Sequence, residues 1–266
     1  MQTVSGVAGT ERAASDTPDV AAFIDKWRAR EPEMVYAEVF CPRHLHARFV
    51  LWGALLFELR AAAFELSDAR LIEAKCAWWA DELLHCAQGA PRHPLTKALA
   101  TPELPWNGLA RGMLDVAHAD VARPADRAAA LAAVMPLAES IGRVEAVLFN
   151  ASMSNDASTA VAIHLLGERL RIGLAAADAG RVPLTLLARH GVTAASLSQL
   201  QGVPAVSDWA AELVATLPSN LAGIALYRRT RTGFDTWFLR ELAANPARRA
   251  MPSLRALWLA WRAARQ

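Results

Sequence analysis

Two neighbouring segments of the chain, residues 43–66 and 69–88, place apolar side chains at the three- and four-residue spacing of an amphipathic helix. In the first segment these side chains are Phe49, Trp52, Leu56, Leu59 and Ala63. Ser67-Asp68, between the two segments, is a good cap for the second helix. Ala and Leu, both strong helix formers, dominate a composition that is 54% hydrophobic, and the chain has only two Tyr. The sequence therefore predicts an all-α protein.

The whole chain of 266 residues fits one large domain. Residues 1–17 are small and polar and are predicted to form a disordered N-terminal tail. Residues 18–266 contain no internal repeat, low-complexity tract or Gly–Ser linker, so they are predicted to form a single helical domain. We expect helices over residues 18–31, 32–40, 43–66, 69–88, 108–121, 124–154 with a potential kink at Pro136, 156–178, 184–190, 193–200, 206–245 as one or two helices, and 251–265.

The net charge and the cysteines indicate which classes of partner and which cellular compartment to expect. The net charge of +2 provides no overall positive field, so nucleic acid is not an expected partner. The three Cys form no Cys-x-x-Cys pair, which favours a reducing cytoplasm. Neither a signal peptide nor a transmembrane helix is predicted from the apolar runs. A cytoplasmic protein is expected, with peripheral contact at the inner membrane as the alternative.

The last predicted helix, residues 251–265, combines several arginines with Trp258 and Trp261. A basic amphipathic helix of this kind is typical of a segment that lies on an anionic membrane surface. The pattern also suits a helix that docks on its own domain and keeps its arginines in water. Docking is the favoured interpretation, and a weak peripheral membrane contact is the alternative.

Several motifs occur in one order between about residues 36 and 195 and together resemble the squalene/phytoene synthase family. The matching segments include Trp78-Trp79-Ala-Asp81-Glu82-Leu83, Gly89-Ala-Pro91-Arg-His93-Pro94, Ala138-Glu-Ser-Ile-Gly142, Leu166-Gly167-Glu-Arg-Leu-Arg171 and Gly180-Arg181-Val-Pro183. The resemblance implies a helical bundle of the trans-isoprenoid synthase type with a central cavity. Catalytic members condense two prenyl diphosphates head to head, and two Asp-rich motifs hold the Mg²⁺ ions that bind the diphosphates.

Both Asp-rich motifs are lost in this chain. Arg60 and Phe64 stand at the aligned positions of the first motif, and Ile172 and Ala176 at those of the second. Mg²⁺ requires hard oxygen ligands, so these positions provide no cage for it. No cofactor is therefore predicted, Mg²⁺ being expected only if the protein is an enzyme. The departure resembles the family's non-catalytic branch, which includes a mitochondrial assembly factor for respiratory complex I.

Six residues are candidates for lining the cavity or binding an anion: Glu58, Arg60, Lys75, Trp79, Glu82 and Arg171. Arginine suits phosphate recognition, so Arg60 and Arg171 are candidate anion binders. The spacing of Lys75, Trp79 and Glu82 places them on one helix face. Each has a structural alternative, in which the tryptophan packs and the charges are exposed. In the same alternative, Arg60 pairs with Glu58 or Glu65, and Arg171 with Glu168 or Asp178.

The favoured hypothesis is a non-catalytic squalene/phytoene synthase-like protein that binds an isoprenoid, another lipid or a protein partner in an assembly or scaffold role. The alternative is a prenyltransferase acting on isoprenoid diphosphates, with arginine and lysine in place of metal. A third hypothesis is a different enzyme that uses Glu58, Glu65 or Glu82 as acid or base. The chemical character of the side chains that line the interior discriminates among these three hypotheses.

Overall fold

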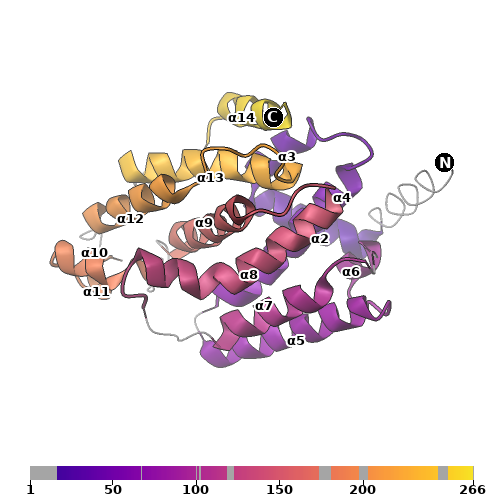
Figure 1. The fold of residues 1–266 in the computed structure, drawn as a ribbon, viewed down its shortest axis with the longest axis horizontal. Helices are drawn as coiled ribbons and strands as arrows, with labels where there is room; N and C mark the ends of the chain where they lie inside the picture. The colour runs from indigo at the N-terminus through magenta and orange to yellow at the C-terminus, as the bar shows by residue number, and fades with distance from the viewer. Residues whose placement is uncertain are drawn as a thin grey trace.

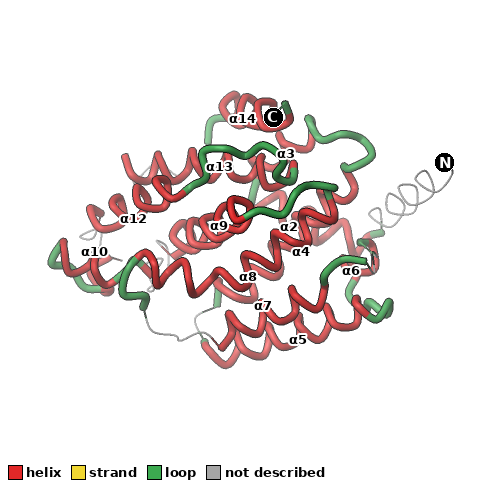
Figure 2. The backbone as a smooth tube through the Cα atoms, in the orientation of Figure 1, coloured by secondary structure: helices red, strands yellow, loops and turns green. Residues whose placement is uncertain are grey.

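The computed structural model describes residues 17–66, 68–99, 101, 103–118, 123–173, 181–197, 203–244 and 251–265. Within these ranges every regular element is a helix (Figures 1 and 2), so the prediction of an all-α fold is confirmed. Residues 1–16 of the predicted tail lie outside these ranges. The helices are α2 (Pro18–Arg30), α3 (Pro32–Glu38), α4 (His46–Phe64), α5 (Ala69–Ala87), α6 (Pro94–Ala98), α7 (Trp106–His118), α8 (Arg127–Leu148), α9 (Asn155–Gly173), α10 (Leu184–Arg189), α11 (Ala194–Leu197), α12 (Val203–Thr216), α13 (Leu226–Ala244) and α14 (Ser253–Ala264).

Successive long helices pack against one another. Helix α5 contacts α7, α7 contacts α8, α8 contacts α9, and α13 contacts α9, α12 and α14. Figure 1 shows α5 and α7 along one edge of the molecule, α8 and α9 across its middle, and α12, α13 and α14 toward the opposite edge. No described helix combines the length and apolar character that crossing a bilayer requires.

Helix α4 corresponds to the first of the two apolar segments that the sequence singles out, and it is buried almost all round. Every residue from Phe49 to Phe57 is buried, as expected for a helix with apolar side chains on all sides. Trp27 of α2 lies directly on its backbone, since a Cβ at Gly53 would come within 2.4 Å of the Trp27 ring. This position in the core also carries Arg60, near the end of the helix, into the interior, where it is 3% exposed.

Some helix boundaries differ from those expected. Helix α8 continues through Pro136 but ends at Leu148, before the predicted end at 154. There Asn150 adopts a positive φ of 49°, a conformation that Asn tolerates, and the Ala151 N–H donates to the carbonyl of Ala146. The segment predicted over 206–245 as one or two helices contains two, α12 and α13, because Pro218 follows the end of α12 and cannot continue it. The predicted helix over 156–178 is described only as far as residue 173.

Candidate functional site: a buried network of charged residues

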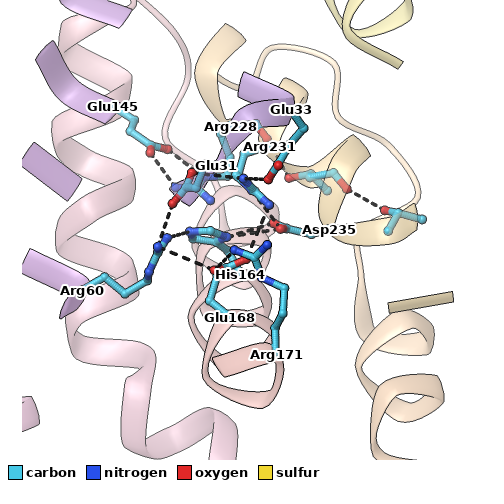
Figure 3. A network of polar contacts seen from close by, with 12 residues as sticks. Glu31, Glu33, Arg60, Glu145, His164, Glu168, Arg171, Arg228, Arg231 and Asp235 are labelled. Atoms are coloured by element: carbon cyan, nitrogen blue, oxygen red, sulfur yellow. Dashed lines mark hydrogen bonds and ion pairs between the residues drawn. The ribbon is translucent and has the colours of Figure 1, made fainter. Parts of the chain in front are cut away.

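Ten ionisable side chains from five regions of the chain meet in the interior, and we call them the central charge network (Figure 3). They come from the α2–α3 junction, α4, α8, α9 and α13, and all except Arg171 are at least nine-tenths buried. The basic members are Arg60, Arg171, Arg228 and Arg231. The acidic members are Glu31, Glu33, Glu145, Glu168 and Asp235, and His164 completes the set.

One end of the network joins α13 to α8 and α4. Arg228 donates from Nε and Nη2 to the two oxygens of Glu145, at 3.0 and 2.6 Å. Trp52 of α4 donates its indole N–H to Glu145 Oε1 at 3.0 Å. This fork-to-fork geometry is the strong form of an ion pair, and all three side chains are buried. Three helices far apart in sequence are thereby held in one register.

Arg231 is the hub of the network. Its Nη1 donates to Glu31 Oε2 at 3.1 Å and to Glu33 Oε1 at 2.8 Å, and its Nε donates to Asp235 Oδ1 at 2.9 Å. Its Nη2 lies 3.6 Å from Glu168 Oε1. One guanidinium of α13 thus reaches carboxylates from the α2–α3 junction, from α9 and from its own helix.

Arg60 enters the network from α4. Its Nη2 lies 2.7 Å from Glu31 Oε1 and 3.6 Å from Glu168 Oε2, and its Nη1 lies 3.1 Å from His164 Nε2. A guanidinium can only donate, so Nε2 of His164 must accept, and this imidazole is neutral with its proton on Nδ1. That proton faces Asp235 Oδ2 at 3.2 Å. Burial, the largest influence, lowers the pKa of His164 in agreement with the neutral form.

The charges of the network nearly balance. Burial raises the pKa of Glu31, Glu168 and Asp235, but the neighbouring arginines outweigh burial and hold all three values below the usual range. At Glu33 burial prevails over the attraction of Arg231, and the pKa is raised. With five carboxylates facing four guanidinium groups and a neutral imidazole, one negative charge is in excess. Glu33 is the carboxyl that takes up a proton most readily to remove it.

The structure brings two of the six sequence-predicted residues, Arg60 and Arg171, into this network. Arg171 donates to Glu168 at 2.6 Å, which is one of the two pairings considered as its structural alternative, and is 29% exposed at the edge of the network. Arg60 pairs with Glu31 instead of its sequence neighbours. Those neighbours have other partners, since Glu58 pairs with Lys26 at 2.6 Å and Glu65 with Arg30 at 3.1 Å. Asp178, the other partner considered for Arg171, lies outside the described residues.

The remaining candidates on α5 lie apart from the network. Lys75 is exposed, whereas Trp79 and Glu82 are buried, so the three do not share one environment. Trp79 packs against the His93 ring with ring centroids 4.9 Å apart. Glu82 Oε1 accepts the backbone N–H groups of Arg92 and His93 at 2.8 and 2.9 Å.

Glu82 therefore holds the turn between α5 and α6. Its carboxylate also accepts from Arg92 Nε at 3.1 Å and from the Thr96 hydroxyl. Burial raises the pKa of Glu82, and these hydrogen bonds together lower it below its usual range. The motif of two tryptophans followed by Gly-x-Pro-x-His-Pro thus builds a clamped turn, in which the carboxylate has a structural task.

The residues present do not fit the Mg²⁺ ions that the fold implies. Arg60, at a first-motif position, is a buried and paired cation, and Ala176 of the second motif lies outside the described residues. The ligand atoms of His164, Glu168 and Asp235 do lie within 4.8 Å of one another. Each of them already contacts the guanidinium of Arg60 or of Arg231, and these fixed positive charges repel a divalent cation.

The arrangement of the helices is that of the all-α isoprenoid synthase fold of squalene synthase-like proteins. The chain is similar to a dehydrosqualene synthase whose structure was solved in complex with a ligand, at a TM-score of 0.66 and 16% identity, covering 92% of this chain and 95% of that one. It is also similar to the squalene synthase HpnC from Alicyclobacillus acidocaldarius, at a TM-score of 0.59 and 14% identity, covering 93% and 97%. No protein-family model and no curated protein sequence matches the chain. The predicted resemblance is therefore confirmed at the level of the fold.

Proposed function

We propose that this chain is a non-catalytic squalene/phytoene synthase-like protein that acts by binding a lipid or protein partner, in an assembly or scaffold role. The observation that supports this best is the state of Arg60. It stands where the family's first Asp-rich motif would supply a metal ligand, it is 3% exposed, and it is ion-paired with Glu31 at 2.7 Å. A buried, ion-paired arginine at this position supplies no ligand for the metal that would assist ionisation of a prenyl diphosphate.

The charge balance argues against the alternative, a prenyltransferase that binds diphosphate with arginines instead of metal. Every arginine of the central charge network has a carboxylate partner within 3.1 Å. A diphosphate would have to displace those carboxylates and would enter a region that already has an excess negative charge. Like charges in a poorly solvated interior repel strongly. The network therefore favours no anionic substrate.

The third hypothesis, a different enzyme that uses a glutamate as acid or base, also finds little support. Of its three candidate glutamates, Glu58 and Glu65 form ion pairs with Lys26 and Arg30, and Glu82 holds a turn. A general acid or base needs access to a reacting group. Each of these carboxylates is occupied by a partner on its own chain.

The test is an incubation of the purified protein with farnesyl and geranylgeranyl diphosphate, with and without Mg²⁺, in which release of diphosphate is followed. A catalytically active dehydrosqualene synthase, assayed in parallel, shows that the substrates and the metal are competent. We expect no release above the protein-free rate in either condition. Mg²⁺-dependent turnover would refute the proposal, and metal-independent turnover lost in Arg171→Ala would favour the anion-binding enzyme instead.

A further inference from the structure

The C-terminal helix α14 has two opposite faces of different character. Its buried residues are Ala256, Ala260 and Ala263, which are at most 5% exposed. The helix packs on α13 and α3. The other side, which we call the α14 outer face, consists of Leu254, Arg255, Trp258, Trp261, Arg262 and Arg265, all exposed. At 3.6 residues per turn, these six positions fall within an arc of about 120° opposite the alanines.

Contacts at both ends fix α14 to the domain, so the outer face has a defined orientation. Tyr36 of α3 and Ser253 at the start of α14 share a hydrogen bond of 2.8 Å between their hydroxyls. At the other end, Arg229 of α13 donates to the carbonyl oxygen of Ala263 at 3.2 Å. Figure 1 shows α14 as the outermost element on its side of the molecule. The docking expected for this helix is present, and the outer face is directed away from the domain.

The apolar side chains of the outer face are large. Leu254 is 82% exposed, Trp258 43% and Trp261 40%. Isolated exposed apolar residues are common, but two tryptophans and a leucine on one arc of a terminal helix form a patch that suits an apolar partner.

The charges of the outer face are all positive. Arg255 and Arg262 lie over the Trp258 ring, at 5.0 and 5.5 Å from its centroid, and Arg265 lies over the Trp261 ring at 4.4 Å. No acidic residue occurs between positions 251 and 265. A tryptophan flanked by guanidinium groups presents an amphipathic ring for the interfacial layer of a bilayer and cations for its phosphate groups. This charge complementarity selects an anionic surface.

We propose that the α14 outer face binds the surface of an anionic phospholipid bilayer, with Leu254 and the two tryptophans entering the interfacial layer and the three arginines contacting lipid phosphates. This binding is peripheral, and it requires no change in the fold because the face is already exposed. It depends on α14 and not on the central charge network, so its test is independent of the proposed absence of catalysis.

The experiment is flotation of the full chain with vesicles of phosphatidylcholine alone or mixed with phosphatidylglycerol, at low and high salt. We expect binding to the mixed vesicles only, weakened by salt. Each arginine near an anionic surface strengthens binding about fivefold, so the triple variant R255Q/R262Q/R265Q should bind on the order of 100-fold more weakly. The control R70Q/R111Q/R127Q removes the same charge from exposed arginines elsewhere and should bind far better than the α14 triple variant.

A second pair of variants tests the apolar contribution. Leu254→Ser should weaken vesicle binding severalfold, whereas Leu71→Ser, at a leucine that is 53% exposed on α5, should leave it unchanged. Circular dichroism checks that each variant keeps its fold. Absence of binding to both kinds of vesicle would overturn the proposal. So would equal loss in the control variants, or self-association of the chain that Trp258→Ser abolishes, which would assign the face to a second copy.

Discussion

The excess carboxylate of the central charge network leads to a paired prediction in which the same chemical substitution has opposite consequences at two positions. Glu33→Gln removes one negative charge where the pKa is raised, and Glu168→Gln removes one where the pKa is lowered. Both side chains are at least nine-tenths buried. Glutamine matches glutamate in size, so the comparison isolates the charge.

For Glu168→Gln we expect a loss of about 3–5 kcal/mol in the free energy of unfolding, the usual cost of breaking a buried ion pair by removing one partner. The substitution removes the carboxylate of α9 that faces Arg171 at 2.6 Å and the more distant Arg60 and Arg231. A carboxyl with a lowered folded pKa stabilises above its unfolded pKa, and this contribution disappears only as pH falls through the folded value. The loss should therefore stay constant between about pH 5 and pH 8.

For Glu33→Gln the sign is the reverse. A group whose folded pKa is raised contributes stability below its unfolded pKa of about 4.5, and this contribution is lost as pH rises through the folded value. Wild type should therefore lose stability relative to Glu33→Gln from about pH 5 upward, by about 1.4 kcal/mol for each unit of the rise in pKa. Near pH 5 the two proteins should differ by less than about 1 kcal/mol, since the glutamine carbonyl can still accept from Arg231.

The assay is urea unfolding followed by circular dichroism at several pH values between about 5 and 8, with linear extrapolation to water. Glu139→Gln is the matched control, because Glu139 forms an exposed ion pair with Arg143 at 3.0 Å that should contribute less than about 1 kcal/mol. The reasoning fails if Glu33→Gln is as destabilising as Glu168→Gln at the alkaline end of the range, or if its deficit grows with pH.

Three further predictions concern the central charge network, the packing of α4 and the turn after α5, each measured by the same urea unfolding. Arg60→Met should cost about 3–5 kcal/mol because Glu31 Oε1 loses its guanidinium partner and the buried network gains a second excess negative charge, and no loss would contradict the network. Gly53→Ala should cost about 1–3 kcal/mol through the clash with Trp27. Gly233→Ala, whose new Cβ would meet no atom within 4 Å beyond its chain neighbours and the backbone of its own helix, should stabilise by roughly 0.5–1 kcal/mol. Glu82→Ala should cost about 2–3 kcal/mol through the unsatisfied turn N–H groups, and a neutral result would exclude the clamp.

The helices could be predicted from the sequence because apolar periodicity, proline and caps act locally. Asp68, predicted to cap the second long helix, accepts the backbone N–H of Arg70 at 2.9 Å, and α5 begins at Ala69. Where a local signal was weak, the boundary was wrong. The end of α8 depends on Asn150 adopting a left-handed conformation, which the spacing of apolar residues does not predict.

The network could not be predicted in the same way, because its partners are distant in sequence. Arg231 and Glu33 are 198 residues apart, and Trp52 and Glu145 are 93 residues apart. Charged residues at spacings of three and four along α13, such as Arg228, Arg231 and Asp235, normally indicate a solvated helix face. The charged face of α13 can be buried only because four other regions of the chain supply complementary charges.

The sequence did contain one signal of an unusual interior, the replacement of both Asp-rich motifs. In a metal-dependent synthase of this fold, Mg²⁺ ions neutralise both the carboxylates of the Asp-rich motifs and the diphosphate of the substrate. In this chain the counter-charges of Glu31, Glu168 and Asp235 are guanidinium groups of the chain itself, those of Arg60, Arg171 and Arg231. Each guanidinium group of the network already has a carboxylate partner, so none is left unpaired for an anionic ligand. If the chain is non-catalytic as proposed, its partner is therefore to be sought at the surface of the molecule and not in the network.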